Sequence, residues 1–254
     1  MVTPTDGRVS IVTGAGSGIG KATALRLAHA GCIICACDIN EEGLRETAKA
    51  IQSGGRTCFT GLIDVRDRKS VESWCSEVVD RFTKIDCLFS NAGLNARSGF
   101  DEMTLAQWNL VIDTHVTGAF NFCQPVLRYM VGRRSGAIVI TSSDFAVVGV
   151  PNAANYCAAK TALYSLTKSL ALEFAADGIR VNAIGPGPID TPLLRSGRTQ
   201  EEYQSARRNF ESRLPIKRLG QPEEVAAVVE FLLSSRAAYI TGQLVQPNGG
   251  QVLW

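Results

Sequence analysis

The chain has 254 residues, of which 45% are hydrophobic and 20% charged. This length and composition fit one domain of the larger α/β type and exclude a disordered, collagen-like or low-complexity chain. Lys and Arg together number 26 and Asp and Glu 24, so the net charge is only +2. A near-neutral balance without a long basic run argues against a protein dedicated to nucleic-acid binding.

The ends of the chain and its cysteines bear on where the protein works. The first eight residues lack the segments of a secretory signal, and no apolar run reaches the roughly 18 residues of a membrane span. We therefore expect a cytoplasmic protein that binds no membrane, with its eight cysteines as free thiols. Cys32 and Cys35 form a CxxC pair, but on a strand they face opposite sides, and no second pair or nearby His completes a metal set. We expect them to pack in the core and predict no metal site.

Short apolar runs alternate with amphipathic stretches along the chain. The sequence predicts strands at roughly 8–12, 32–37, 57–62, 86–90, 136–142, 179–184 and 243–247. Between them it predicts helices near 18–30, 41–53, 67–82, 104–131, 155–177 and 222–234, the fourth opening on a capping box at Thr104 and Gln107. This alternation indicates an α/β protein with a doubly wound Rossmann fold, in which helices cover both faces of a parallel sheet of about seven strands. No linker or repeat divides the chain, so we expect residues 1–254 to form a single domain.

The longest stretch without a predicted element runs from about 185 to 215. A loop of that length in a compact domain is usually functional. Its apolar start at 192–194 and its mostly polar remainder can form a short helical lid, with the apolar side over a substrate. We therefore expect residues 188–213 to cover the substrate and to become ordered when ligands bind.

The first predicted strand runs into a turn with glycines at alternate positions, and a helix follows. Glycine allows the tight turn and a close backbone approach to a pyrophosphate, and the helix N-terminus supplies free N–H groups. The strict GxGxxG spacing is absent, so the alternative is a glycine-rich turn that binds nothing. The residues that we expect to contact a dinucleotide here are Gly14, Ser17, Gly18, Ile19 and Gly20.

Asp38 ends the second predicted strand, 18 residues after Gly20. An acidic side chain at this place accepts hydrogen bonds from the adenosine ribose of a dinucleotide. A 2′-phosphate would meet a like charge, and no Lys or Arg within 14–20 or beside Asp38 offsets it. Unless Asp38 is an ordinary residue at a strand end, the sequence favours NAD over NADP.

Further polar groups fall at strand ends and at the start of a helix. Tyr156 and Lys160 lie four residues apart and share one face of the helix predicted from 155. Ser143 ends a buried strand 13 residues before Tyr156, and Asn91 follows another strand. A Gly-Pro-Gly-Pro segment follows a third strand at 185–188.

Together these motifs resemble the short-chain dehydrogenase/reductase family, in the family's order and almost from end to end. They are the turn at 13–20, Asp-Val at 64–65, Asn-Ala-Gly at 91–93, Ser143, Tyr156 with Lys160, Pro-Gly at 186–187 and Thr191. The ending at 238–250 is similar to the family's 3-oxoacyl-thioester reductase branch. The family is commonly tetrameric, so the resemblance implies a homotetramer.

The resemblance implies catalytic roles for three residues. Tyr156 is expected to be the general acid/base that exchanges a proton with the substrate oxygen, and Ser143 to hydrogen-bond that oxygen. Tyr has an ordinary pKa of about 10, and an ammonium about 4 Å away stabilises the tyrosinate by roughly 4 kcal/mol, which lowers the pKa by up to about 3 units. Lys160 is placed to supply this charge and, as in the family, to bond the nicotinamide ribose.

The family's cofactor contacts carry over by position. Asp64 and Val65 resemble the pair that meets the adenine, and Ile189 and Thr191 resemble the residues that bind the nicotinamide carboxamide. The resemblance implies that the other cofactor contacts come from Asn91, Ala92, Gly93, Tyr156, Lys160, Pro186 and Gly187.

One position departs from the family's pattern. The family usually has an Asn in the fourth helix that helps to hold a water linking the Lys to solvent, and here that residue is His115. Histidine can also hold water or pass a proton, so we include His115 among the expected catalytic residues. The alternative is a neutral, buried His that makes one hydrogen bond.

The leading hypothesis is an NAD-dependent oxidoreductase that moves a hydride between the nicotinamide and a small secondary alcohol or ketone. The alternatives are a 3-oxoacyl-thioester reductase and, in a different class, a dinucleotide-binding regulator that has lost catalysis. The sequence does not select the alcohol, because loops such as 94–103, 144–155 and 188–213 build the substrate pocket. An exposed Trp254 would be an unfavourable apolar end, so we expect it at an interface of a homo-oligomer.

Overall fold

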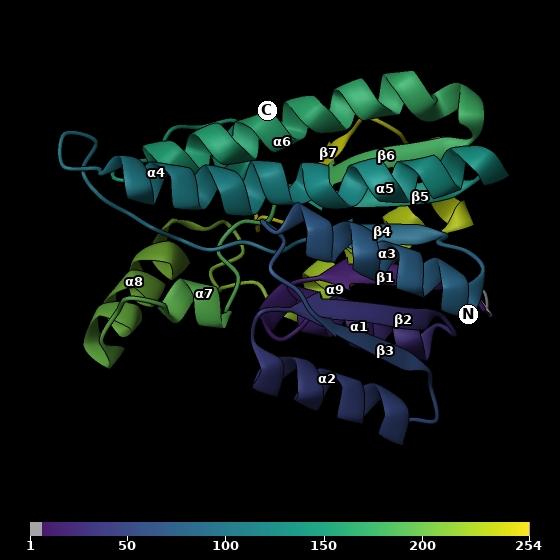
Figure 1. Cartoon of the computed structure of the whole chain (residues 1–254). Coiled ribbons are helices and arrows are strands. Elements are labelled where there is room, and N and C mark those ends of the chain that lie inside the picture. The colour runs from purple at the N-terminus through teal and green to yellow at the C-terminus, as the bar shows by residue number, and fades with distance from the viewer. Residues whose placement is uncertain (1–6, 254) are drawn as a thin grey trace.

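The computed structural model describes residues 7–253, so Trp254 and its expected interface lie outside the described part of the chain. One seven-stranded sheet of parallel strands has the order β3-β2-β1-β4-β5-β6-β7 (Figure 1). Each strand lies within two residues of its predicted bounds. The strands are β1 (Val9–Thr13), β2 (Ile33–Asp38), β3 (Cys58–Leu62), β4 (Cys87–Ser90), β5 (Gly136–Thr141), β6 (Ile179–Ile184) and β7 (Leu244–Val245).

Helices cover both faces of the sheet, which confirms the doubly wound Rossmann fold. One face carries α3 (Arg68–Phe82), α5 (Gly118–Arg133) and α6 (Ala154–Phe174). The other face carries α1 (Gly18–His29), α2 (Glu41–Ser53) and α9 (Pro222–Leu233). Within residues 7–253, none of the helices combines the length and the apolar character that crossing a lipid bilayer requires.

The two faces enclose two hydrophobic cores, and strands β1 to β6 contribute to both because successive side chains alternate. In β1, Ile11 packs into the core under α3, α5 and α6, while Val12 packs into the core under α1, α2 and α9. The same alternation separates Cys32 from Cys35, which pack into different cores, as their positions on a strand predict. All eight cysteines are free thiols.

The predicted helix at 104–131 is in fact two α-helices joined by a π-helical turn. The capping box at Thr104 is confirmed and opens α4 (Leu105–Ile112), which continues into η1 (Asp113–Thr117) and then α5. In this region the Thr114 hydroxyl donates to the carbonyl of Leu110 at 2.7 Å, a local bond that competes with the helical ladder. Such π-turns often occur at functional sites, and this one carries His115.

The stretch expected to be mostly irregular, 185–215, contains α7 (Pro192–Arg195) and the 14-residue α8 (Gln200–Arg213). α8 opens on a second capping box, in which Thr199 accepts from the N–H of Glu202 and Glu202 accepts from the N–H of Thr199. This Thr-x-x-Glu spacing was present in the sequence and predicts a helix start. The two helices stand apart from the layers that flank the sheet, at the end where α4 begins (Figure 1).

Candidate active site

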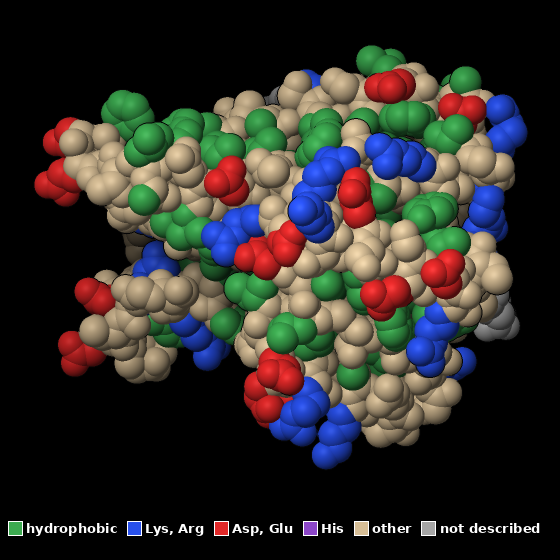
Figure 2. All heavy atoms as spheres, viewed as in Figure 1, with side chains coloured by type: hydrophobic (Ala, Val, Ile, Leu, Met, Phe, Trp, Pro, Cys, Tyr) green, Lys and Arg blue, Asp and Glu red, His purple; other side chains and the backbone are tan. Residues whose placement is uncertain are grey.

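The carboxyl ends of the strands open into a cavity of about 500 Å³. Figure 2 shows the molecule hollowed on this side, between the part that carries α4 and the part that carries α8. All of the predicted site residues except Gly20 line this cavity. They are Gly14, Ser17, Gly18, Ile19, Asp38, Asp64, Val65, Asn91, Ala92, Gly93, His115, Ser143, Tyr156, Lys160, Pro186, Gly187, Ile189 and Thr191.

The glycine turn has the geometry of an anion cradle. Gly14 and Gly18 adopt φ of +67° and +51°, which favours glycine. Ser17 precedes α1 but makes no side-chain capping bond, so its hydroxyl does not occupy the first N–H groups of the helix. Gly20 lies beneath the turn, where a Cβ would overlap the carbonyl oxygen of Gly14. The first helical turn is therefore free to receive phosphate oxygens, and Gly20 serves it by close packing rather than by lining the cavity.

Asp38 holds the turn from the next strand. Its Oδ2 accepts from the N–H of Gly16 and its Oδ1 from the N–H of Asn40, both at 2.8 Å. The nearby Arg66 donates from Nε to Asp64 Oδ1 at 3.0 Å and from Nη2 to Oδ2 at 2.6 Å, and these bonds hold the pKa of that carboxyl below its ordinary value. This end of the cavity therefore has a carboxylate, Asp38, and an arginine, Arg66, that is already paired with Asp64.

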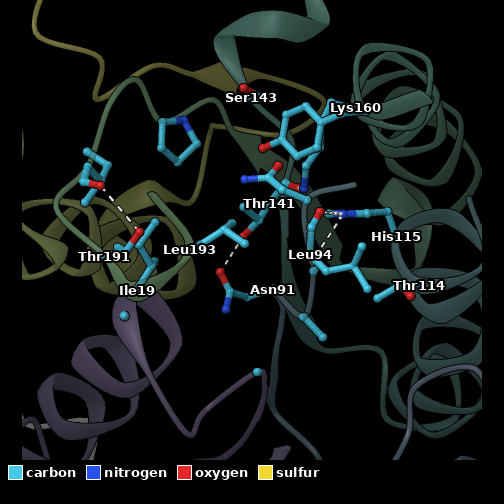
Figure 3. Close-up of a pocket in the computed structure, with 18 of the residues that line it drawn as sticks. Ile19, Asn91, Leu94, Thr114, His115, Thr141, Ser143, Lys160, Thr191 and Leu193 are labelled. Atoms are coloured by element: carbon cyan, nitrogen blue, oxygen red, sulfur yellow. Dashed lines mark hydrogen bonds between the residues drawn. The ribbon is translucent and has the colours of Figure 1, made fainter. Parts of the chain in front are cut away.

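Asn91 ties together three strand ends beneath the cavity. Its side-chain amide donates to the Thr13 carbonyl at 3.3 Å. Its Oδ1 accepts from the Thr141 hydroxyl at 3.1 Å (Figure 3). These bonds join the ends of β1, β4 and β5. Gly93 follows on the same strand end and packs against the ring of His115, leaving no room for a Cβ.

Ser143, Tyr156 and Lys160 line the same cavity, and Figure 3 shows Ser143 and Lys160 at one side of it. The Lys160 side chain is 2% exposed; its Nζ donates to the Thr141 carbonyl at 2.7 Å and lies 5.4 Å from the centre of the Tyr156 ring. Burial lowers the pKa of Lys160 to about 7. Burial raises the pKa of Tyr156 to about 12, although the hydrogen bond with Ser143 and the charge of Arg97 act in the opposite direction.

The expected lowering of the Tyr156 pKa is therefore wrong, since burial raises it. The expectation counted the charge of the lysine and left out desolvation, which disfavours both charged forms, tyrosinate and ammonium. In this state the phenol is protonated at neutral pH.

His115 lies against Tyr156, with ring centres 5.5 Å apart in an edge-to-face arrangement. Its Nε2 meets the backbone of Leu94, 2.9 Å from the carbonyl oxygen and 3.1 Å from the nitrogen (Figure 3). Burial, together with the charge of Lys160, lowers the pKa of His115 to about 3, so the imidazole is neutral. Its buried Nδ1 has no hydrogen-bond partner among the described residues.

The segment that follows Pro186 forms the outer wall. The Thr191 hydroxyl accepts from the N–H of Leu194 at the start of α7. Asp190 accepts from Arg195 at 2.7 Å and from the Tyr203 hydroxyl at 2.9 Å, which joins α7 and α8. The side chains that this segment adds to the cavity wall are mainly apolar: Leu193, Leu194 and Phe210.

Sequence reasoning missed several lining residues, and Asp144 is the most unusual of them. It directly follows Ser143, lines the cavity and is 1% exposed. Burial raises its pKa to about 6. An acidic residue next to a predicted active-site serine at a buried strand end was a visible sign. Arg97, Phe145 and Leu110 were not singled out either, although loops 94–103 and 144–155 were expected to build the pocket.

Comparison with known proteins places the chain in a family. The family described as enoyl-(acyl carrier protein) reductase matches residues 14–251. A 3-oxoacyl-[acyl-carrier-protein] reductase of Thermotoga maritima is 38% identical over 248 residues, which are 98% of this chain and 99% of the relative. The cis-4-hydroxycyclohexanecarboxylate dehydrogenase of Sinomonas cyclohexanicum is also 38% identical, with 96% of each chain covered. The crystal structure of NAD⁺-bound xylitol dehydrogenase matches with a TM-score of 0.90 at 34% identity, covering 96% of this chain and 99% of that one.

The chain belongs to the short-chain dehydrogenase/reductase family. It is therefore an oxidoreductase of a family that binds a nicotinamide dinucleotide. The relatives differ in the substrates that their names state, so the finer assignment depends on this chain's own residues.

Proposed function

We propose that the protein is an NAD-dependent oxidoreductase that interconverts a small secondary alcohol and a ketone, with Tyr156 as general acid/base. The observation that carries this proposal is a single cavity that brings two groups of residues together. One group is the glycine turn before α1, whose first N–H groups have no side-chain cap, together with Asp38. The other group is Ser143, Tyr156 and Lys160. This arrangement provides for a dinucleotide along the strand ends and for proton transfer where its nicotinamide would lie.

The residues at the adenine end support NAD. The Asp38 carboxylate faces the cavity and would repel a 2′-phosphate while accepting hydrogen bonds from a ribose diol. Arg66 is paired with Asp64 and is not available to a phosphate without breaking that pair. The NAD⁺ in the structurally similar xylitol dehydrogenase agrees with this choice.

A nicotinamide dinucleotide held by the glycine turn and Asp38 would supply hydride-transfer chemistry, and this chain's residues would handle the proton. The neutral Tyr156 phenol can donate to the oxygen of a ketone as that oxygen gains charge. In the reverse direction the phenol must first lose its proton to solvent, and the charge of Arg97, with that of Lys160 in its protonated form, would stabilise the resulting tyrosinate. Ser143, which the Phe145 N–H holds at 3.1 Å, would orient the substrate oxygen.

Residues 188–213 are proposed to cover the substrate. Their apolar side chains Leu193, Leu194 and Phe210 face the cavity, and closure would exclude water from the hydride path. We also propose that residues 1–254 form one domain that works as a cytoplasmic homo-oligomer, by resemblance a tetramer.

A 3-oxoacyl-thioester reductase is the second candidate. The identity of 38% with the Thermotoga maritima enzyme favours it. Asp38 opposes it, since by resemblance that branch mostly uses NADPH.

A spectrophotometric screen tests the proposal. Secondary alcohols are offered with NAD or NADP, ketones and a 3-oxoacyl thioester with NADH or NADPH, and the change in reduced-cofactor absorbance is followed. We expect a higher kcat/KM with NAD than with NADP. In Asp38→Ala the ratio of these two values should be smaller. Equal or better use of NADP by the unmodified protein would refute the cofactor assignment, and absence of turnover would favour a regulator without catalysis.

A further inference from the structure

Arg97 differs from the other Lys and Arg side chains that line the cavity. Arg66 is paired with Asp64, and Lys160 is buried and donates to the Thr141 carbonyl. The guanidinium of Arg97 has no hydrogen-bond or ion-pair partner among residues 7–253, and the residue is exposed. The cavity wall therefore holds one cation that is both accessible and free to bind a ligand.

Hydrogen bonds fix the backbone on both sides of Arg97 to the start of α6. The Asn155 side chain donates to the carbonyl of Ala96 at 2.9 Å. On the other side, the N–H of Ser98 donates to the carbonyl of Asn152 at 3.2 Å. Arg97 is thereby held beside the helical turn that carries the proposed general acid/base.

The side chain of Arg97 is also close to the proposed reacting centre. Arg97 and Tyr156 line the same cavity, and the charge of Arg97 lowers the pKa of Tyr156, although burial outweighs this effect. A charge that reaches the phenol also reaches a substrate whose oxygen meets that phenol. The two side chains share no hydrogen bond, so the guanidinium is free to meet another part of the substrate.

The carboxylates that line the cavity leave an anionic ligand room beside Arg97. Asp38 holds the glycine turn, and Asp64 is paired with an arginine. Asp144 is only 1% exposed, so its charge presents almost no surface to a ligand. A single guanidinium balances the single charge of a carboxylate, and its planar fork matches the two carboxylate oxygens.

We propose that Arg97 is a specificity-determining residue that binds a carboxylate of the substrate, so that the substrates are hydroxy acids and the matching oxo acids. The carbon chain between the hydroxyl and the carboxylate would lie against apolar side chains of the cavity wall, such as Leu94 and Phe145. This inference rests on the proposed function, because it takes the reacting hydroxyl to lie at Ser143 and Tyr156.

Matched acids and amides test the proposal in the full-length protein. NAD-linked oxidation of 3-hydroxybutyrate, 5-hydroxyhexanoate and 3-hydroxycyclohexanecarboxylate at pH 8 is compared with that of their primary amides, which keep the shape and remove the charge. A hydrogen bond to a charged group contributes about 10-fold or more, and the lower end of this range applies to an exposed guanidinium. The wild type should therefore prefer at least one acid over its amide by about 10-fold in kcat/KM, mainly through KM.

Three variants show whether this preference comes from Arg97. Arg97→Gln should bring the ratio of acid to amide close to one, and the ratio is the readout because a lost charge on Tyr156 affects acid and amide alike. Arg97→Lys keeps the charge without the fork and should keep part of the preference. Arg56→Gln, which changes an exposed arginine outside the cavity, should leave the ratio unchanged.

The outcomes separate failure of this inference from failure of the proposed function. A preference for an acid that is lost in Arg97→Gln and kept in Arg56→Gln supports the inference. Equal use of every acid and its amide overturns it, as does a preference that Arg97→Gln leaves intact, and in both cases the proposed function stands. If no alcohol, charged or neutral, is oxidised with NAD, the proposed function fails and this inference fails with it.

Discussion

Replacing Asp144 by Asn should stabilise the protein without ligands, and by more at pH 8 than at pH 5. Asn keeps the shape of the side chain and an oxygen that can accept from the Ser143 hydroxyl, but it removes a charge that burial disfavours. The folded-state pKa of Asp144, about 6, lies above the ordinary value of 3.8. The stability that the protonated acid provides is therefore complete below pH 3.8 and is lost as the pH rises to about 6.

The size of the effect follows from this difference in pKa. A shift of about two units corresponds to about 3 kcal/mol in the free energy of unfolding once the acid is ionised in both states. At pH 5 the folded state is still mostly protonated, and the same linkage relation leaves roughly half of that difference. Asp144→Asn should therefore gain up to about 3 kcal/mol at pH 8 and roughly half of that at pH 5.

Urea unfolding of the wild type and Asp144→Asn at pH 8 and pH 5, followed by circular dichroism, measures both values. Asp80→Asn is the control, and because Asp80 is exposed its change in stability should be small at both pH values. If Asp144→Asn raises the free energy of unfolding equally at pH 8 and pH 5, or lowers it at pH 8, the reasoning is refuted.

Three further predictions concern the proposed machinery. Tyr156→Phe should lower turnover by at least about 10²–10⁴-fold while NAD binding, measured by calorimetry, survives; a near-normal kcat would mean that another group moves the proton. His115→Asn should keep substantial activity and His115→Leu should lower kcat and alter its pH profile, whereas an unchanged His115→Leu enzyme would favour a purely structural imidazole. Hydrogen exchange over residues 188–213 should slow when NAD and substrate bind, and equal protection with and without ligands would make the segment fixed scaffold.

Local patterns in the sequence were sufficient to predict most of the fold. Strand positions follow from short apolar runs, and the parallel sheet follows from their alternation with amphipathic helices, because both patterns are properties of neighbouring residues. The glycine turn and the four-residue spacing of Tyr156 and Lys160 are local in the same sense, and both line the cavity. The start of α8 was also predictable, since Thr199 and Glu202 have the spacing of a capping box.

Tertiary structure decided what depends on the surroundings of each group. The sequence contains the charge of Lys160 but not the burial that lowers its pKa to about 7 and raises that of Tyr156 to about 12. It contains His115 but not the burial and the nearby Lys160 charge that lower its pKa to about 3 and keep the ring neutral beside Tyr156. It also contains Asp144, but only the folded chain leaves one of its oxygens buried and without a described partner. Desolvation and hydrogen-bond satisfaction arise from contacts between segments far apart in the sequence, so no local pattern encodes them.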